Sequence, residues 1–396
     1  MGELISIDEA QGRVLDVVRP LPAEDVPLAE ALGRVLAHDV ESAIDVPPFD
    51  SSAMDGYAVV AGPAAELEIV GESRAGHPAS ARVAPGTAIR ISTGAALPAG
   101  ATAVVPLEGS SDDGAGGRVR VRASAEGDNV RRAGEDIAYG RVVLHASSRL
   151  GPAELGVAAS VGRGSLRCSL RPRVSVLVTG DELTEPGRPL APGGIYSSNA
   201  WALAAQVDRA GAVVTARETV RDAAPDTRAA LARVLDSSDV VIVSGGVSVG
   251  PHDHVKPALR ELGVEQLFWG VRLRPGKPTW FGTRGSALVF GLPGNPVSAM
   301  VAFHLFVRPA LDALQGADPA VPRARATLDE PIPRHPTREQ AVRVHLESAG
   351  DGWHARATGP QGSHMLTSML GASALARIAP GEGAVAAGER VEVELL

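Results

Sequence analysis

Residues 173–183, RVSVLVTGDEL, decide the fold class of this chain. The run from Val174 to Val178 is apolar except for Ser175, which is typical of a strand buried on both faces of a sheet. Similar apolar runs alternate along the chain with helical patterns, which predicts a doubly wound, mostly parallel α/β domain. The expected strands are 174–178, 213–220, 240–243 and 287–290, and the expected helices are 199–210, 225–235, 252–262 and 296–314.

The segments on either side of this α/β domain have different patterns. Residues 7–36 predict two short helices interrupted by prolines, to which residues 150–161 are expected to return. Short Val- and Ile-rich runs between Gly and Pro turns predict an inserted β-rich domain and a small C-terminal domain resembling a β-barrel. The expected strands of these two domains are 57–60, 68–70, 88–92, 103–105, 118–121, 326–328, 342–346, 354–357 and 391–395, with a hairpin tip at 110–117. The expected domains are residues 1–45 with 140–170 (helical), 46–139 (β-rich), 171–316 (α/β) and 320–396 (C-terminal β).

The composition narrows the classes of protein to consider. The 396 residues carry 38 Lys and Arg against 46 Asp and Glu, and this net charge of −8 argues against a nucleic-acid-binding protein. The single cysteine, Cys168, excludes an intrachain disulfide and a multi-cysteine metal site, and it is expected to be a small buried side chain. No apolar run is expected to reach the ~20 residues that cross a bilayer, and no secretory signal is expected. We therefore expect a cytoplasmic protein without membrane contact.

Two loops that follow buried strands carry candidate ligand groups. The first places Asp181 beside Glu182, and such carboxylates suit a hard cation such as Mg²⁺ with a phosphate partner, although a helix-capping turn is the alternative. The second, residues 244–250, is rich in glycine, which lets backbone N–H groups approach an anion, although a structural turn is the alternative. His252 and His254 follow without a third ligand at metal-binding spacing, so a transition-metal site is not expected.

A basic turn and a rigid turn complete the candidates in the α/β domain. Residues 271–278, VRLRPGKP, concentrate three cations in an acidic protein, which indicates an oxyanion or phosphate clamp or, alternatively, a solvated edge strand. Residues 291–296, GLPGNP, form a rigid loop before a long apolar helix whose N-terminus faces the expected ligand edge of the sheet. In the β-rich domain, polar groups gather in residues 47–58, 90–94 and 128–136, and each segment alone is typical of a turn or solvated loop.

Seven motifs follow one another along nearly the whole chain, and together they closely resemble those of the molybdopterin molybdenumtransferase family, which includes bacterial MoeA proteins and the E domain of gephyrin. The motifs are PPFDSSAMDGYAV, RISTGAALPAGATAVVP, GDNVRRAGEDI, VLVTGDEL, VIVSGGVSVGPHD, RPGKP and GLPGNPVSAMVAF. The resemblance implies four domains and a homodimer whose active cleft lies between the β-rich domain of one subunit and the α/β domain of the other. It also implies that adenylyl-molybdopterin and molybdate react, with Mg²⁺, to give molybdenum cofactor and AMP. It leaves open a contact with the molybdopterin adenylyltransferase of the preceding step.

The resemblance assigns site residues position by position. The catalytic candidates are Asp55, Thr93, Glu182, Asp222 and Asp253, and the last three are also the candidate Mg²⁺ ligands. The candidates for binding substrate and anion are Arg131, Asp136, Ser244, Gly245, Gly246, Ser248, Arg274, Lys277, Pro293, Gly294, Asn295 and Pro296. Arg274 stands where many relatives have Lys and Gly270 where some have another Lys, which puts the local affinity for molybdate in question. The alternative functions are an adenylyltransferase that activates the pterin with ATP, and a non-catalytic scaffold.

Overall fold

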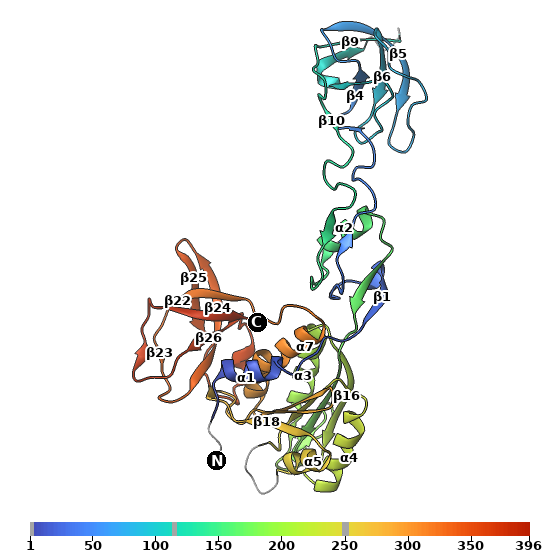
Figure 1. Cartoon of the computed structure of the whole chain (residues 1–396). Coiled ribbons are helices and arrows are strands. Elements are labelled where there is room, and N and C mark those ends of the chain that lie inside the picture. Colours follow the sequence, from blue (N-terminus) through green and yellow to red (C-terminus); the bar gives the residue numbers. More distant parts are fainter. Residues whose placement is uncertain (1–3, 113–116, 248–252) are drawn as a thin grey trace. The chain divides into compact units, whose positions relative to one another are not determined.

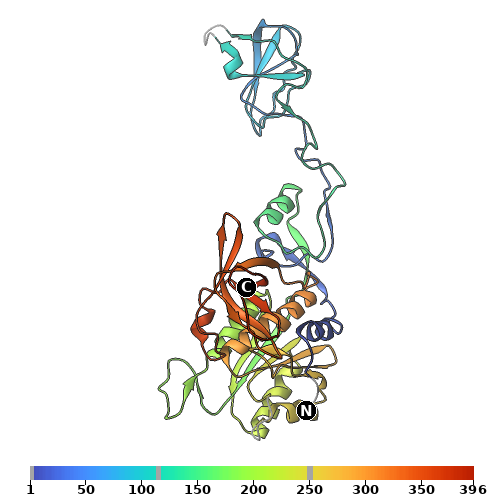
Figure 2. The same cartoon turned by 90° about the vertical axis from the view of Figure 1, so that its left-hand side faces the viewer.

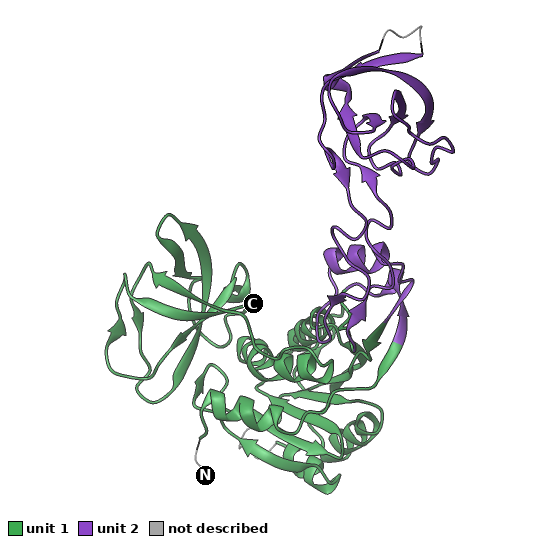
Figure 3. Cartoon of the chain, turned by 45° about the horizontal axis from the view of Figure 1, so that its top comes forward, with its two compact units in different colours: residues 1–24, 33–37, 167–396 green, residues 25–32, 38–166 purple. Residues whose placement is uncertain are grey.

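The structure is a computed structural model that describes residues 4–112, 117–247 and 253–396. The chain forms two compact units, which Figure 3 shows in different colours. One unit holds residues 1–24, 33–37 and 167–396, and the other holds residues 25–32 and 38–166. The domain limits expected from the sequence remain a prediction.

The larger unit is built around a six-stranded sheet with the order β16-β13-β17-β21-β20-β18. Figure 1 labels its two edge strands, β16 and β18. Its first four strands run parallel, and β20 pairs antiparallel with β21 on one side and with β18 on the other. The predicted doubly wound, mostly parallel sheet is therefore confirmed, and the antiparallel pair is an addition that the sequence does not predict. The strands are β13 (Arg173–Thr179), β16 (Val213–Val220), β17 (Val240–Ser244), β18 (Glu265–Trp269), β20 (Trp280–Arg284) and β21 (Ala287–Leu292).

Both faces of this sheet are covered by helices, because alternate side chains of the central strands enter two separate cores. Val240 and Ile242 belong to the core that includes residues of α3 (Ser198–Arg209) and of the long helix after β21. Val241 and Val243 belong to the core that includes residues of α4 (Ala224–Leu235) and α5 (Val255–Glu261). This alternation explains why the strand is apolar throughout. The expected helix 252–262 begins later than predicted, and residue 252 lies outside the described residues.

The long helix after β21 consists of α6 (Pro296–Ala302), a π turn η3 (Phe303–Val307) and α7 (Arg308–Leu314). Contrary to the expectation from the sequence, its 19 residues are long and apolar enough, by length and composition, to cross a membrane. In this fold 78% of its most apolar window is buried inside the protein, and the core helix of a soluble protein passes the same test.

The N-terminal segment differs from the two predicted helices. The first is α1 (Ile7–Leu15), which packs against α7 and η3. The second is replaced by the strand β1 (Ala23–Pro27) and the 3-10 turn η1 (Leu28–Glu30). Pro20, Pro22 and Pro27 remove backbone donors and disfavour helical conformation in the residues before them, so the three-residue spacing of apolar positions does not produce a second helix.

The C-terminal part of the larger unit, orange to red in Figure 2, is a closed β-barrel of five strands, which confirms the predicted β-barrel-like domain. Closure results from pairing of β24 with β26 in addition to the order β24-β25-β22-β28-β26, and β19 (Leu273–Arg274) pairs with β24 from the α/β domain. The other elements here are β22 (Arg323–Leu328), β23 (Ile332–Pro333), β24 (Glu339–Ala349), β25 (Gly352–Ala357), η4 (Leu366–Met369), β26 (Ala374–Ile378), β27 (Ala384–Val385) and β28 (Arg390–Leu395).

The smaller unit contains a six-stranded sheet of the order β7-β4-β6-β5-β9-β8. Its strands confirm the predicted β-rich insertion, and they are β4 (Gly56–Val59), β5 (Ala65–Ser73), β6 (Thr87–Ile91), β7 (Ala103–Pro106), β8 (Ser110–Asp112) and β9 (Arg118–Val121). β8 and β9 pair as a hairpin, and residues 113–116 at its tip lie outside the described residues. The remaining elements of this unit are β2 (Val40–Glu41), β3 (Ser51–Ser52), η2 (Leu107–Gly109), β10 (Val130–Arg131), β11 (Val142–Leu144) and α2 (Pro152–Ser160). Two short strands, β14 (Leu183–Thr184) and β15 (Ile195–Tyr196), belong to the larger unit. The strand β12 (Ser165–Ser169) runs from the smaller unit into the larger one.

Candidate functional site

The carboxyl ends of four parallel strands bring the predicted loops of the α/β domain to one edge of the sheet. Thr179 is the partner of Val220 in the register, and Ser244 is the partner of Leu292. The loops after these four residues contain the candidates Glu182, Asp222, Gly245, Gly246, Pro293 and Gly294. This is the edge at which open α/β sheets bind ligands.

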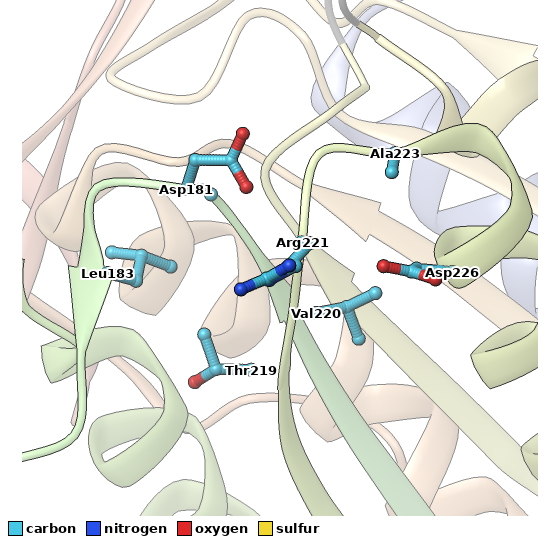
Figure 4. A pocket seen from close by; sticks show the side chains of 8 residues that line it. Asp181, Leu183, Thr219, Val220, Arg221, Ala223 and Asp226 are labelled. Atoms are coloured by element: carbon cyan, nitrogen blue, oxygen red, sulfur yellow. The ribbon is translucent and has the colours of Figure 1, made fainter.

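A cavity of about 670 Å³ opens at this edge, between the ends of β13 and β16 (Figure 4). Its polar lining includes Asp181, Arg221 and Asp226. The Asp181 Oδ1 atom accepts a hydrogen bond of 3.2 Å from the backbone N–H of Asp222, so the two loops are joined directly. Both acidic and basic groups line the cavity, which suits a ligand that carries phosphates and a bound cation.

Glu182 does not line this cavity, but its carboxylate folds back over the glycine before it. A Cβ atom on Gly180 would lie 2.5 Å from Glu182 Oε2 and 2.9 Å from Oε1. Only glycine permits this approach without movement of the carboxylate. The carboxylate is exposed, as is expected of a group that receives a ligand from solvent.

The buried amide of Asn199 joins the glycine-rich loop to the rigid Pro-Gly loop. Asn199 Nδ2 donates to Ser244 Oγ at 2.9 Å and to the carbonyl oxygen of Gly294 at 2.7 Å. Ser244 Oγ in turn donates to the carbonyl oxygen of Pro293 at 3.0 Å. Ser244 therefore positions the two loops through hydrogen bonds.

The glycine-rich loop passes directly over Thr179, and this close approach explains two of its glycines. A Cβ atom on Gly245 would lie 2.8 Å from the carbonyl oxygen of Thr179, and one on Gly246 would lie 2.7 Å from Val255 Cγ2. Both glycines have positive φ, 96° and 64°. Thr179 Oγ1 is buried and has no hydrogen-bond partner among the described residues. Ser248 lies outside the described residues.

The rigid loop is held by the C-terminal barrel as well as by the α/β domain. Asn295 Nδ2 donates to Ser363 Oγ at 3.0 Å, and the Val297 N–H donates to the Ser363 carbonyl oxygen at 3.1 Å. Asn295 is the N-cap residue of α6 and Pro296 follows at its first position. The barrel segment around Ser363 is fixed by Arg343, which is 1% exposed and donates to the carbonyl oxygen of Gly362 at 3.2 Å.

The basic turn is compact and its two candidate cations differ in exposure. Arg274 is exposed, whereas Lys277 is half-buried. Gly270 has a φ of 90°, and a Cβ atom on it would lie 2.6 Å from Leu4 Cδ2. A lysine at this position would therefore strain the turn, which gives a structural reason for the glycine. Arg272 Nη1 donates to the carbonyl oxygen of Leu4 at 2.7 Å and supports the same turn.

In the smaller unit, the structure brings Asp55 and Thr93 together. Asp55 Oδ1 accepts a hydrogen bond of 2.7 Å from the backbone N–H of Thr93. A second cavity, of about 590 Å³, is lined by Arg131 and Asp136 and also by Gly94, the residue after Thr93. Four residues predicted from distant motifs therefore lie at or next to one hollow. Its other lining residues are Val46, Pro47, Phe49, Ser51 and Glu135.

A neighbouring carboxylate of the smaller unit has a structural role. Asp50 Oδ1 accepts from the Ala133 N–H at 2.9 Å, and its Oδ2 pairs with Arg132 at 2.7 Å. The backbone hydrogen bond from Ala133, followed by that from Arg132, lowers the pKa of Asp50. Asp50 thus holds the turn at Arg132 in place as a carboxylate.

The described residues contain no group of three or more His, Cys, Asp or Glu that could hold a metal ion by itself. Glu182, Asp222 and Asp253 therefore do not form a closed three-carboxylate centre. Their oxygen donors fit Mg²⁺ chemically, and Mg²⁺ is commonly held by one or two carboxylates together with the phosphates of a substrate.

Asn199, Arg343 and Ser363 are site residues that the sequence analysis does not identify. The sequence offers Ser197, Ser198 or Asn199 as the cap of this helix; Ser197 occupies the cap position, and the Asn199 side chain instead joins two loops. Arg343 and Ser363 lie in the barrel, and no local pattern indicates that this segment reaches α6. Arg343 interrupts a short apolar run, AVRV (residues 341–344), and a cation inside such a run is a signal that can be found in the sequence.

Comparisons with known proteins agree with this geometry. Three family models match: "MoeA N-terminal region (domain I and II)" over residues 5–162, "Probable molybdopterin binding domain" over 175–313, and "MoeA C-terminal region (domain IV)" over 325–396. "Molybdopterin molybdenumtransferase 2" of Mycobacterium tuberculosis is 39% identical over 98% of both chains. "Molybdopterin molybdenumtransferase" of Haemophilus influenzae is 34% identical over 99% of this chain and 98% of the relative.

A solved structure with the same architecture supports the sequence matches. The crystal structure of the molybdopterin biosynthesis moeA protein from Pyrococcus horikoshii OT3 superposes with a TM-score of 0.85 at 30% identity, and the match covers 100% of both chains. The three family models cover the chain from residue 5 to residue 396 with short gaps. This chain belongs to the MoeA family of molybdopterin molybdenumtransferases.

Proposed function

We propose that this chain is a molybdopterin molybdenumtransferase that inserts molybdenum from molybdate into adenylyl-molybdopterin and releases AMP. The observation that carries the proposal is the set of rigid loops at the carboxyl edge of the sheet, in a chain that matches named relatives over 98% of its length. The glycine-rich backbone over Thr179, the Arg221 guanidinium and the carboxylates of Asp181 and Asp226 lie at this edge. This combination suits a nucleotide phosphate, an oxyanion and Mg²⁺.

The proposed roles follow from what each group can do. Arg274, Lys277 and the N–H groups of the glycine-rich loop would hold the nucleotide phosphates and the molybdate dianion. Mg²⁺, bound by Glu182, Asp222, Asp253 and the phosphates, would supply charge that polarises the phosphoanhydride. Asp55, Thr93, Arg131 and Asp136 would contribute from the β-rich domain.

The reaction requires a bond at phosphorus to break before molybdenum is captured. A molybdate oxygen or a water oxygen attacks the phosphorus, the anhydride P–O bond breaks, and AMP leaves with the electron pair of that bond. The two dithiolene thiols then bind molybdenum through sulfur. Each molybdate oxygen that they displace takes up two protons, from the thiols and from solvent, and leaves as water, whereas an oxygen already bonded to phosphorus stays on the phosphate. The rigid loop fixes the position of the nucleotide, which lowers the entropy lost in reaching this geometry.

Reconstitution with adenylyl-molybdopterin, Mg²⁺ and low molybdate tests the function. The wild-type protein should release AMP and yield active cofactor, and EDTA should abolish both until Mg²⁺ is restored. The Asp55→Asn variant should fold and still fail, because its amide oxygen can accept the Thr93 N–H while the negative charge is lost. Asp39→Asn is the matched control, since Asp39 accepts a similar bond from Ala146 away from the candidate residues. Normal insertion by Asp55→Asn would falsify a central role for this carboxylate.

The two alternative functions would give different products in the same reconstitution assay. An adenylyltransferase would consume ATP with metal-free molybdopterin and release pyrophosphate, whereas we expect no such release. A scaffold would neither release AMP nor load molybdenum. We also propose that the protein is a homodimer, which light scattering after gel filtration measures directly.

A further inference from the structure

The indole of Trp269 joins two of the segments that are predicted to bind anions, the glycine-rich loop and the basic turn. Trp269 is the last residue of β18, and its Nε1 atom donates a hydrogen bond of 3.0 Å to the carbonyl oxygen of Val247 in the glycine-rich loop. Its backbone leads directly into the basic turn, where the Gly270 N–H donates to the carbonyl oxygen of Thr279 at 2.8 Å. One half-buried residue therefore connects both segments.

The antiparallel strand β20 brings the basic turn to the ligand edge of the sheet. β20 runs against both β21 and β18, so β18 ends at the same edge as β21. In the register, Trp269 is opposite Trp280, and Trp280 is opposite Gly291. The basic turn connects β18 to β20, so it lies at the edge that also carries the glycine-rich loop and the rigid loop.

Gly291 makes room for the glycine-rich loop to reach across the sheet towards β18. A Cβ atom on Gly291 would lie 2.7 Å from Val247 Cγ1, so a larger residue there would push Val247 away. Val247 is 2% exposed, and its side chain belongs to the same core as Trp280 and Val289. Packing thus fixes the place of the Val247 side chain, but apolar contacts have no direction and do not orient its carbonyl group.

The described part of the glycine-rich loop, residues 244–247, is anchored by hydrogen bonds at both ends. Ser244 is held through its hydroxyl group, and the Trp269 N–H holds the carbonyl group of Val247. Between these anchors, Gly245 and Gly246 have positive φ, and glycine has more accessible conformations than any other residue. Without the second anchor the peptide groups between them can turn, and their N–H groups no longer keep one direction towards an anion.

The Trp269 ring is itself held in place. Lys256 Nζ, from α5, lies 4.9 Å from the centroid of the ring, within the range of a cation–π interaction. An indole has two side-chain torsions and a single N–H donor, so a ring held by its neighbours directs this donor at little cost in entropy. The hydrogen bond to Val247 therefore has few alternative geometries.

We propose that Trp269 is a positioning residue for nucleotide binding. Its N–H group holds the glycine-rich loop next to the basic turn, so that both segments present their donors to one ligand that carries phosphate. The proposal rests on the proposed function in one respect, because it takes this ligand to be the AMP part of adenylyl-molybdopterin. Trp269 contributes without touching the ligand, since a loop already held in its binding conformation loses less entropy when the anion binds.

Calorimetric titration of AMP into the full-length protein tests this role without turnover. Trp269→Phe keeps an aromatic ring beside Lys256 but removes the N–H, and we expect it to raise the dissociation constant for AMP about fivefold or more. Trp353→Phe, at an exposed position of β25, is the control for the same substitution and should leave the constant unchanged. The number of AMP sites per chain should equal that of the wild type in both variants. A merely structural defect would lower this number, because unfolded chains bind no AMP, and would not change the affinity of the folded chains.

The outcomes separate this proposal from the proposed function. Wild-type affinity for AMP in a folded Trp269→Phe protein would overturn the positioning role, while AMP release and molybdenum insertion would still test the function. A fivefold weaker affinity would support the positioning role even if the reconstituted reaction yielded no cofactor. A wild-type protein that binds no AMP would contradict both proposals.

NMR of the wild-type protein provides a second measurement in case Trp269→Phe does not fold. Nitrogen-labelled tryptophan gives one indole N–H signal for each of the four tryptophans, and the Trp269 signal is assigned by elimination from Phe variants of Trp201, Trp280 and Trp353. We expect the Trp269 signal to shift when AMP is added, because the hydrogen-bonded loop contacts the ligand, and the Trp353 signal to stay in place. A Trp269 signal that does not respond to saturating AMP would refute the positioning role.

Discussion

Asn199 fixes two loops that lie 45 and 95 residues further along the chain, to Ser244 and Gly294 respectively. We expect Asn199→Asp to destabilise the larger unit by about 1–3 kcal/mol, because a carboxylate of the same shape cannot donate to the Gly294 carbonyl oxygen or to Ser244 Oγ. Urea unfolding followed by tryptophan fluorescence measures this unit, since Trp201, Trp269 and Trp280 belong to it, as does Trp353.

The same substitution should also impair molybdenum insertion at protein concentrations where the variant is folded. The control for the unfolding measurement is Asn295→Asp. This variant loses one hydrogen bond to Ser363 at an exposed residue, so it should lower the free energy of unfolding less than Asn199→Asp does. Equal unfolding midpoints for Asn199→Asp and the wild type would show that the two loops are held by other contacts.

The buried side chain of His304 should make the free energy of unfolding depend on pH. It is 3% exposed, and burial, with smaller contributions from Arg308 and Arg209, lowers its pKa to about 3. Glu394 Oε2 lies 3.9 Å from its Nε2, but the Glu394 carboxylate already pairs with Arg323 and Arg377. The folded state therefore keeps His304 neutral, whereas the unfolded chain protonates it below about pH 6.5.

Neutral His304 therefore does not reduce the free energy of unfolding above about pH 6.5. Below that pH the free energy of unfolding falls, and it continues to fall until the pH reaches about 3. At pH 5.5 the loss should be about 1.4 kcal/mol relative to pH 7.5. Unfolding of His304→Gln at both pH values should show a smaller decrease than that of the wild type, while His77→Gln, at an exposed position, should follow the wild type. Parallel curves for His304→Gln and the wild type would contradict this account.

At the scale of elements, the sequence correctly predicts those helices and strands whose apolar residues are spaced as the element requires. β16 is found at its predicted bounds, and α4 and the end of α7 lie within one residue of theirs. The predicted second helix relies on the spacing of Leu28, Leu32 and Val35, but residues 23–30 form β1 and η1. Prolines in that segment disfavour a helix despite the spacing. The sequence also does not predict β18, because this strand is partly exposed and its pattern does not resemble that of a buried strand.

The same distinction applies to the candidate site. Motif residues such as Asp55, Thr93, Arg131 and Asp136 can be singled out from the sequence, since each stands in a turn rich in polar groups. The contact of Ser363 with α6 cannot be predicted from the sequence, because it depends on how the barrel packs against the α/β domain. Ser363 lies 66 residues beyond Val297 in the chain. Long-range packing carries no local period.

Arg343 and the segment it holds give a prediction at the scale of elements. Arg343 donates to Ser368 Oγ at 3.1 Å and to the Gly362 carbonyl oxygen at 3.2 Å, and burial lowers its pKa to about 10. Arg343→Met fills a similar volume but leaves these acceptors unpaired. We expect a loss of about 2–4 kcal/mol and release of residues 360–368 from α6.

Hydrogen exchange of the Val297 amide detects this release, since its N–H bonds to the Ser363 carbonyl oxygen. Exchange should be faster in Arg343→Met than in Arg356→Met, a control that removes an exposed barrel arginine paired with Asp329. Unaltered protection of Val297 in Arg343→Met would mean that Ser363 is held without Arg343.

At the scale of the whole molecule, the candidate residues are divided between the two compact units. Asp55, Thr93, Arg131 and Asp136 belong to the unit of residues 25–32 and 38–166, and Glu182, Asp222 and Asp253 belong to the other. The family resemblance implies that a complete site takes one set from each of two copies. A homodimer would then contain two equivalent sites, each with contributions from both chains.

Mixed dimers of two inactive variants test this arrangement. Asp55→Asn and Glu182→Gln, carried on differently tagged chains and purified through both tags, place both defects in one site and leave the other site intact if the two sets come from different copies. The mixed dimer should then have about half the wild-type activity, although each homodimer is inactive. If both sets came from the same chain, each site of the mixed dimer would carry one defect and no activity would return. Recovery therefore requires a shared site, and a folded but inactive mixed dimer would rule it out.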